Sequence, residues 1–356
     1  MKDTFWNKKK VFITGHTGFK GGWLVMWLKS LGAVVCGYSL KPEKKSLFYE
    51  SNIADGIDSN FGNILNYKKL EKKIKDFSPE IVFHLAAQPI VKKSYTHPQK
   101  TITTNVIGTF NLLESLRSCK DVRSVVIVTS DKVYENQNLI RGYNEKDSLG
   151  GHDPYSSSKA CCELITNSYR SSYFSKDNKS IGIATARAGN VIGGGDYSEY
   201  RLIPDLFKSI EKNKTLILRN KNHTRPWQHV LEALRGYITL AKSLYNDSGK
   251  FSEAWNFGPR LKDCKNVKWI INKFRKNFDF EIKEVSNNKF HESKLLQLDI
   301  SKAKKKLRWE PILSVVDAID LTSEWYKKRG DGERVSKIML YQIKKYKQKL
   351  LEKNYE

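Results

Sequence analysis

Tyr155 and Lys159 lie four residues apart in the segment DPYSSSK. On a helix this spacing places both side chains on one face. A phenol titrates near pH ~10, and a nearby ammonium group favours its ionised form. The pair therefore predicts a tyrosine that takes a proton from a substrate hydroxyl near neutral pH. The Y-x-x-x-K pattern also arises by chance in many proteins, so its context matters.

Three polar residues, Ser130, Asp131 and Lys132, follow the apolar run VVIVT. If the run is a parallel strand, its carboxyl end faces the cleft of the sheet. We expect Ser130 to hydrogen-bond the hydroxyl that Tyr155 deprotonates. Asp131 and Lys132 add an acid and a base that a simple dehydrogenase does not require. The alternative for these two is a surface ion pair or a turn.

A glycine-rich loop, VFITGHTGFKGGWL, lies between a predicted strand and a predicted helix. Its glycines permit a tight turn and a close approach of backbone to a pyrophosphate at the helix N-terminus. The loop predicts a dinucleotide cofactor bound by its three spaced glycines, Gly15, Gly18 and Gly21.

The type of dinucleotide is left open by the second predicted strand. No Asp or Glu stands at residues 37–39, where an acidic side chain would bind the ribose 2′-hydroxyl of NAD. Lys41 could instead favour the 2′-phosphate of NADP.

The first half of the chain alternates short apolar strands with amphipathic helices. This alternation predicts an α/β fold with a doubly wound parallel sheet. The expected strands are 11–15, 33–40, 80–87, 124–130 and 181–190, and the expected helices are 21–32, 66–77, 103–117 and 154–173.

The pattern becomes irregular from about Val191, where we expect short strands and loops. We therefore predict a cofactor domain over 1–190 and a smaller lobe over 191–330 that binds substrate and is interleaved with the last core elements. Residues 331–356 are predicted to be a helical tail, because 337–353 has apolar residues at helical spacing.

The composition narrows the possible partners. The net charge of +25 comes from lysines spread along the whole chain, which suits solvated surfaces and an anionic substrate better than nucleic acid. No apolar run reaches the roughly 20 residues of a membrane helix, so we expect no membrane partner and a cytoplasmic protein. Five cysteines without metal-ligand spacing predict reduced thiols and no metal site.

With these residues in place, the chain resembles the extended short-chain dehydrogenase/reductase family over nearly its entire length. Within that family it is similar to the dehydratases that act on CDP-glucose. The matching segments are HTGFKG at 16–21, GYSL at 37–40, HLAAQP at 84–89, TNVIGT at 104–109, TSDKVYEN at 129–136, DPYSSSK at 153–159, RAGNVIGGGD at 187–196, RPWQHV at 225–230 and WNFGP at 255–259.

The resemblance implies a Rossmann fold and an internal redox cycle that uses NAD. Tyr155 would deprotonate the glucose 4-hydroxyl while C4 gives hydride to the cofactor, and Lys159 would hold the cofactor ribose. Water would then leave from C5 and C6, with Asp131 as the acid and Lys132 as the C5 base, before hydride returns to C6. A lysine base must be a neutral amine, which a desolvated cleft favours. The product would be CDP-4-dehydro-6-deoxyglucose, for deoxysugar biosynthesis.

The resemblance also implies two sets of binding residues. The cofactor set is Gly15, His16, Thr17, Gly18, Phe19, Lys20, Gly21, Asn63, Ile64, Leu85, Ala86, Ala87, Gln88, Asn105, Thr129, Tyr155 and Lys159. The substrate set is Gln88, Arg187, Asn190, Arg201, Arg219, Arg225, His291 and Glu292, because arginine binds phosphate oxygens in a bidentate manner.

Two positions depart from the family pattern. Val133 stands where close relatives often carry cysteine, and Asn63 replaces an aspartate at the third-strand turn, which could weaken adenine binding.

Other functions share parts of this pattern. A UDP- or dTDP-sugar 4,6-dehydratase would need the same residues, and a sugar 4-epimerase would need Tyr155 and Lys159 without the acid and base at Asp131 and Lys132. A cofactor-bearing scaffold that binds nucleic acid would not need the full catalytic set. In this family two helices, here 105–116 and 154–173, usually pair between subunits, so we expect a homodimer or homotetramer.

Overall fold

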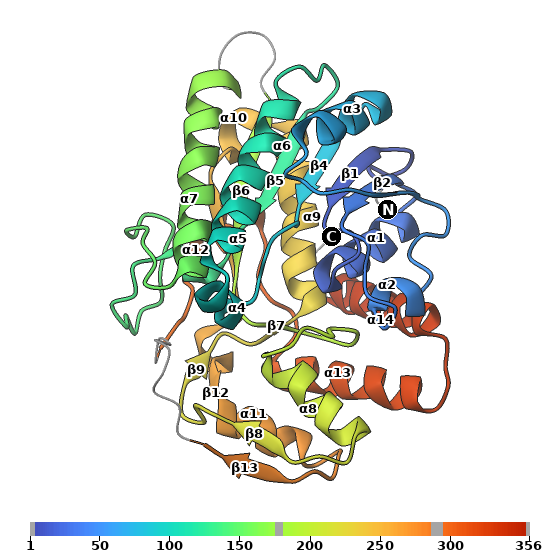
Figure 1. Cartoon of the computed structure of the whole chain (residues 1–356), viewed down its shortest axis with the longest axis vertical. Coiled ribbons are helices and arrows are strands. Elements are labelled where there is room, and N and C mark those ends of the chain that lie inside the picture. The colour runs from blue at the N-terminus through green and yellow to red at the C-terminus, as the bar shows by residue number, and fades with distance from the viewer. Residues whose placement is uncertain (1–3, 175–180, 286–294, 354–356) are drawn as a thin grey trace.

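The computed structural model describes residues 4–174, 181–285 and 295–353. Its centre is a seven-stranded parallel sheet in the order β11-β6-β5-β4-β1-β2-β3 (Figure 1). The chain starts at β1, runs outward to β3, and returns through β4 to the other side. The strands are β1 (Lys10–Thr14), β2 (Val34–Ser39), β3 (Asp58–Phe61), β4 (Ile81–His84), β5 (Ser124–Val128), β6 (Gly182–Ala188) and β11 (Ala254–Phe257). This order confirms the predicted doubly wound sheet.

Side chains along β1 alternate between two apolar cores. Val11 and Ile13 face one core with α1 (Phe19–Ser30) and α9 (Val230–Asn246), whereas Phe12 faces the other with α3 (Tyr67–Phe77) and α6 (Gly108–Leu116). Both faces of the sheet are therefore covered, which explains the continuously apolar strands. The helices of the sheet region are α1 (Phe19–Ser30), α2 (Leu47–Glu50), α3 (Tyr67–Phe77), α4 (Val91–Thr96), α5 (Pro98–Ile102), α6 (Gly108–Leu116), α7 (Pro154–Tyr169), α9 (Val230–Asn246) and α10 (Ser248–Phe251).

Two of the expected helices contain irregular turns. The helix expected over 103–117 begins as a π-helical turn, Thr103–Ile107, before α6, and a second π-helical turn, Arg170–Phe174, extends α7. Short 3-10 turns occupy Asp131–Val133 and Leu261–Asp263.

Residues after 190 are more helical than the sequence pattern predicted. Part of this region forms a lobe beside the carboxyl edge of the sheet, at the bottom of Figure 1, before and after β11 returns to pair with β6. The lobe contains α8 (Leu202–Glu211), α11 (Val267–Phe274) and α13 (Val315–Gly330), whereas α12 (Ser301–Leu307) packs on β11 and α9. Its short strands pair as β7 (Val191–Ile192) with β10 (Gln228–His229), β8 (Leu216–Leu218) with β13 (Ile282–Glu284), and β9 (Thr224–Arg225) with β12 (Lys265–Asn266).

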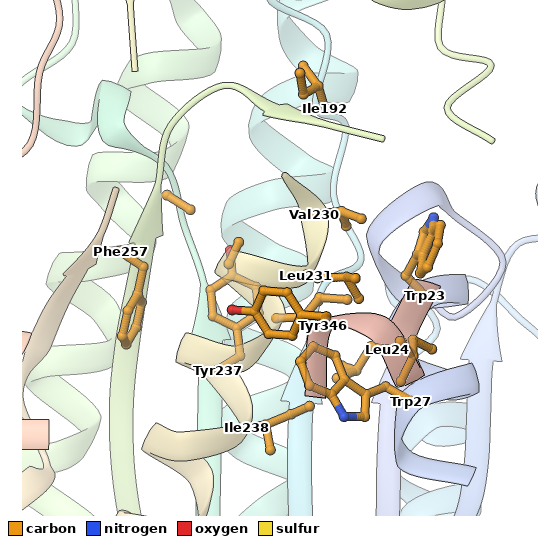
Figure 2. Packing of buried hydrophobic residues seen from close by; sticks show 14 of the residues in the cluster. Trp23, Leu24, Trp27, Ile192, Val230, Leu231, Tyr237, Ile238, Phe257 and Tyr346 are labelled. Atoms are coloured by element: carbon orange, nitrogen blue, oxygen red, sulfur yellow. The ribbon is translucent and has the colours of Figure 1, made fainter. Parts of the chain in front are cut away.

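The helix α14 (Val335–Glu352) packs against α1. The Trp27 ring of α1 meets the Tyr346 ring of α14 edge-on, with 5.6 Å between ring centroids. Figure 2 shows both rings beside Leu231 of α9 in the same buried cluster. The helix that starts at the cofactor loop is thus held between the sheet, α9 and α14.

Across the three described ranges, the longest helices lack an apolar stretch that could cross a lipid bilayer.

Candidate active site

A cavity of about 840 Å³ lies at the carboxyl edge of the sheet. One wall comes from the loops that follow β1, β4 and β5, and the opposite wall comes from α8, β8 and β9. Because the strand order reverses between β1 and β4, this is the place where open α/β sheets bind their ligands.

The N-terminus of α7 positions Tyr155 and Lys159 in this cavity. The Asp153 carboxylate caps the helix by accepting from the backbone N–H groups of Tyr155 and Ser156, both at 3.0 Å. Pro154 occupies the first helical position, where its missing N–H costs nothing. Both side chains are buried, and the Lys159 Nζ donates to the carbonyl oxygen of Val128 at 3.1 Å.

The acidity of Tyr155 differs from the sequence expectation. Burial raises the pKa of its phenol to about 12, and the hydrogen bond with Ser130 only partly offsets this effect. Burial also lowers the pKa of Lys159. In the protein alone the phenol therefore keeps its proton, since the Lys159 ammonium is directed to the end of β5.

The end of β5 brings three further predicted catalytic residues into the cavity. The Ser130 side chain caps the 3-10 turn Asp131–Val133 by accepting from the Lys132 N–H at 3.2 Å. Its hydroxyl also donates to Asp131 Oδ1 at 3.1 Å. Lys132 Nζ lies 3.6 Å from the same oxygen, and the Lys132 side chain is 27% exposed whereas that of Asp131 is 3% exposed. Asp131 Oδ2 is buried and has no hydrogen-bond partner among the described residues, which suits contact with a ligand hydroxyl.

The glycine-rich loop fits a dinucleotide phosphate. Gly15 adopts a positive φ of 77°, and a Cβ there would collide with the backbone of Ala86. A Cβ on Gly21 would overlap the Gly15 carbonyl, so loop and helix pack backbone to backbone. The N-cap of α1, Gly18, provides no side-chain cap, which leaves first-turn N–H groups at the cavity for an anion.

Most of the predicted cofactor residues line the cavity, but three do not. His16 is buried under Gly37 and hydrogen-bonds Ser59, and burial lowers its pKa to about 4, which keeps the ring neutral. The Asn105 amide bonds both the N–H and the carbonyl of Gln88. The residues that do line the cavity are Gly15, Thr17, Gly18, Phe19, Lys20, Gly21, Asn63, Ile64, Leu85, Ala86, Ala87, Thr129, Tyr155 and Lys159.

Lys20 is an unusual member of this lining. Its Nζ lies 3.3 Å from the Tyr237 hydroxyl, on the side of the cavity toward α9. Burial, together with the nearby charges of Arg201 and Lys159, lowers its pKa to about 7. Lys41, by contrast, is exposed and lies outside the cavity lining.

The predicted phosphate-binding arginines separate into two groups. Arg201, Arg219 and Arg225 line the lobe side of the cavity together with Asn190. Arg187 does not: its guanidinium is buried in the core and makes a bidentate salt bridge with Glu163 at 2.9 Å. Its assignment to the substrate is therefore corrected to a structural role. The Gln88 side chain likewise bonds within the protein, to Thr101 and Ile90.

Two predicted substrate residues, His291 and Glu292, lie outside the described residues. Among the cavity residues that sequence reasoning missed are Asp196, Tyr200 and Asp205. Asp196 pairs with Arg201 at 2.9 Å and ends the segment RAGNVIGGGD, so that motif could have revealed it. Tyr200 has a positive φ of 62°, and no pattern in the sequence indicates this backbone conformation.

The comparisons with known proteins agree with this site. The family model described as GDP-mannose 4,6 dehydratase matches residues 12–322. The chain is 46% identical over 335 residues to the CDP-glucose 4,6-dehydratase of Salmonella typhimurium strain LT2, covering 92% of this chain and 93% of that protein. It is 25% identical to the dTDP-glucose 4,6-dehydratase of the same strain, over 98% of this chain and 99% of the other.

Solved structures show the same fold. An epimerase from Methanothermobacter thermautotrophicus has a TM-score of 0.78 at 25% identity and covers 92% of this chain and 95% of its own. The dTDP-glucose 4,6-dehydratase from Bacillus anthracis, in complex with NAD, has a TM-score of 0.75 at 22% identity, covering 91% of this chain and 98% of its own. The sheet, the cavity and these matches together show that the chain belongs to the GDP-mannose 4,6 dehydratase family of extended short-chain dehydrogenase/reductases.

Proposed function

We propose that this protein is a hydro-lyase that converts CDP-glucose to CDP-4-dehydro-6-deoxyglucose. The observation that carries the proposal is that two pairs of reactive side chains line the same cavity. Tyr155 and Lys159 are suited to redox chemistry, and Asp131 and Lys132 are an acid and a base beside them. The 46% identity to a CDP-glucose 4,6-dehydratase supports the choice of nucleotide.

A bound NAD would supply the hydride acceptor and, through the positive charge of its oxidised ring, would favour the Tyr155 phenolate. Ser130 holds the C4 hydroxyl while Tyr155 takes its proton. Once C4 is a ketone, the C5 hydrogen is acidic and Lys132 removes it. Asp131 protonates the C6 oxygen, which leaves as water. The hydride taken from C4 is then delivered to C6 and the proton on Lys132 returns to C5, which completes the product.

The two walls of the cavity are suited to different ligands, one to the cofactor and the other to the substrate. We propose that the glycine loop and the loop after β4 hold NAD, because the first turn of α1 offers backbone donors to its phosphates. The lobe over 191–330 binds the nucleotide sugar. Its three arginines, Arg201, Arg219 and Arg225, suit a diphosphate.

The test is to incubate the protein and NAD with CDP-glucose, UDP-glucose and dTDP-glucose separately. We expect only CDP-glucose to lose the mass of one water at a substantial rate. Equal loss from the UDP or dTDP sugar would contradict the cytidine assignment.

The second candidate is a sugar 4-epimerase, which the likeness to an epimerase structure favours. Product mass separates the two functions, because epimerisation leaves the mass unchanged. The 4-epimerase would also tolerate neutral residues at Asp131 and Lys132, which the dehydratase would not.

We further propose a homodimer or homotetramer in the cytoplasm. Large apolar side chains are exposed on α6, on α7 and on the π-helical turns next to them, as expected for a helix-to-helix contact between subunits: Ile107, Phe110, Leu164 and Tyr173. The cysteines are unpaired thiols, which supports a reducing compartment. Sedimentation of a monomer at micromolar concentration would contradict the assembly.

A further inference from the structure

The segment Ser130–Val133 is held at both ends by a buried network of hydrogen bonds. At its start, the Thr129 hydroxyl donates to Glu163 Oε1 at 2.6 Å. At its end, the Tyr134 hydroxyl accepts from Arg187 Nη1 at 2.7 Å. Arg187 and Glu163 are joined by two bonds of 2.9 Å, so the network closes a loop around the segment.

The Arg187–Glu163 pair is held firmly because both side chains are buried and each makes further hydrogen bonds within the protein. Both side chains are almost fully inaccessible, at 3% and 4% exposure. Burial opposes their charges, but the Arg187 charge and hydrogen bonds more than offset it and lower the pKa of Glu163. Thr185 of β6 also donates to Glu163 at 2.5 Å. Separating a buried ion pair of this kind costs much free energy, so the pair holds the Thr129 and Tyr134 hydroxyls in place.

The far end of the network reaches the last strand of the sheet. The Tyr134 hydroxyl donates to Asn256 Oδ1 at 2.7 Å. The Asn256 amide in turn donates to the carbonyls of Tyr143 and Asp299. The network thus links α7, β5, β6 and β11, of which the strands are neighbours in the sheet (Figure 1).

Resting on the function proposed above, we propose that this network is a clamp that positions Asp131 and Lys132 for the elimination of water. Thr129 and Tyr134 are then positioning residues, since neither hydroxyl is directed at the reacting atoms but each holds one end of the segment. Tyr155 is fixed separately by the Asp153 cap of α7. Ser130 also lies in the clamped segment, so loosening the clamp should slow hydride transfer from C4 too, but less than elimination, because both groups that serve elimination lie on the segment.

Two nearly isosteric variants test the clamp, Tyr134→Phe and Thr129→Val. Each removes one hydroxyl group and little volume; the Thr129 hydroxyl bonds Glu163, and the Tyr134 hydroxyl bonds both Arg187 and Asn256. The matched control is Tyr143→Phe. Tyr143 is equally buried and stacks on Tyr134 at 5.1 Å, but its hydroxyl bonds Gln137 and Asn136, outside the clamp.

The first measurement is hydrogen exchange in the peptide that spans residues 129–134, followed by mass spectrometry without substrate. We expect faster exchange in both test variants and unchanged exchange in the control. This readout needs no sugar nucleotide, so it tests the clamp even if the proposed substrate is wrong. Unchanged exchange in Tyr134→Phe, or equal acceleration in the control, would overturn the proposal.

The second measurement separates the two chemical steps in a single turnover with NAD and CDP-glucose. We expect water loss to slow about 10- to 100-fold in the test variants, the effect of a small misplacement of a catalytic group. Reduced cofactor should therefore accumulate transiently. An equal fall in both steps would mean that the network acts only on overall folding. If the wild type releases no water, the proposed function fails, whereas the exchange result still decides on the clamp.

Discussion

Replacing Lys132 by alanine should separate oxidation of the sugar from loss of water. If Lys132 is the C5 base, its loss removes general base catalysis and should slow elimination about 10²–10⁴-fold, or about 2.7–5.4 kcal/mol of activation free energy. The effect on folding should be small. The Lys132 side chain is 27% exposed and its ion pair with Asp131 spans 3.6 Å, so the free energy of unfolding should fall by less than about 1 kcal/mol. Chemistry, not stability, must then explain the lost turnover.

The assay follows the absorbance of reduced nicotinamide on mixing Lys132→Ala with NAD and CDP-glucose. We expect reduced cofactor to build up and remain, with no change in substrate mass. Deuterium exchange from solvent into C5 reports the base step directly and should be lost. Lys132→Glu is the matched companion, because it restores a base of opposite charge and should recover part of the exchange. Normal C5 exchange in Lys132→Ala would refute the assignment and transfer the base role to Asp131 or another group.

Further predictions concern the redox pair, the cavity lysine Lys20 and the packing. Tyr155→Phe should turn over about 10²–10⁴-fold more slowly than the wild type. Its melting temperature should stay within a few degrees, because only one oxygen is removed. Turnover at the wild-type rate would exclude the phenol as base. Lys20 has its pKa lowered from 10.5 to about 7, so between these pH values only the unfolded chain carries the proton. In denaturant titrations without cofactor, stability should therefore rise with pH in that window, relative to Lys20→Met, by up to about 1.4 kcal/mol per pH unit; parallel curves would contradict it. Gly194→Ala should cost about 1–3 kcal/mol in the same titrations, since its methyl group would overlap the Trp325 indole, and an unchanged midpoint would show that the indole can move.

The sheet and the redox pair could be predicted because local spacing determines them. Buried parallel strands need continuous apolar runs, and Tyr155 and Lys159 share a helix face whatever surrounds them. The edge strand β3 was missed because its sequence, DSNF, has no apolar run. The helix α9 was also missed; twelve of its seventeen residues are buried, and these include the charged Glu232 and Arg235, whose pairing in the core the sequence does not reveal.

The wrong assignment of Arg187 shows what sequence cannot supply. An arginine at a strand end beside a catalytic motif is a reasonable phosphate ligand until its neighbours are known. Glu163 lies on α7, far from Arg187 in sequence, and only the packing of α7 on β6 brings the carboxylate to the guanidinium. The sequence also led us to expect a readily ionised Tyr155, whereas burial raises the pKa of its phenol. This burial, and the hydrogen bond that directs Lys159 to the Val128 carbonyl, are properties of the folded chain.

The contact between α1 and α14 has a consequence for biosynthesis. The ribosome makes α1 early, but the Tyr346 ring that covers Trp27 belongs to a helix made after the whole substrate lobe. Until then the nascent cofactor region presents an uncovered apolar surface, which chaperones bind and which promotes aggregation. A premature stop codon that removes α14 would leave every proposed catalytic residue in the product and still deprive the cell of active enzyme.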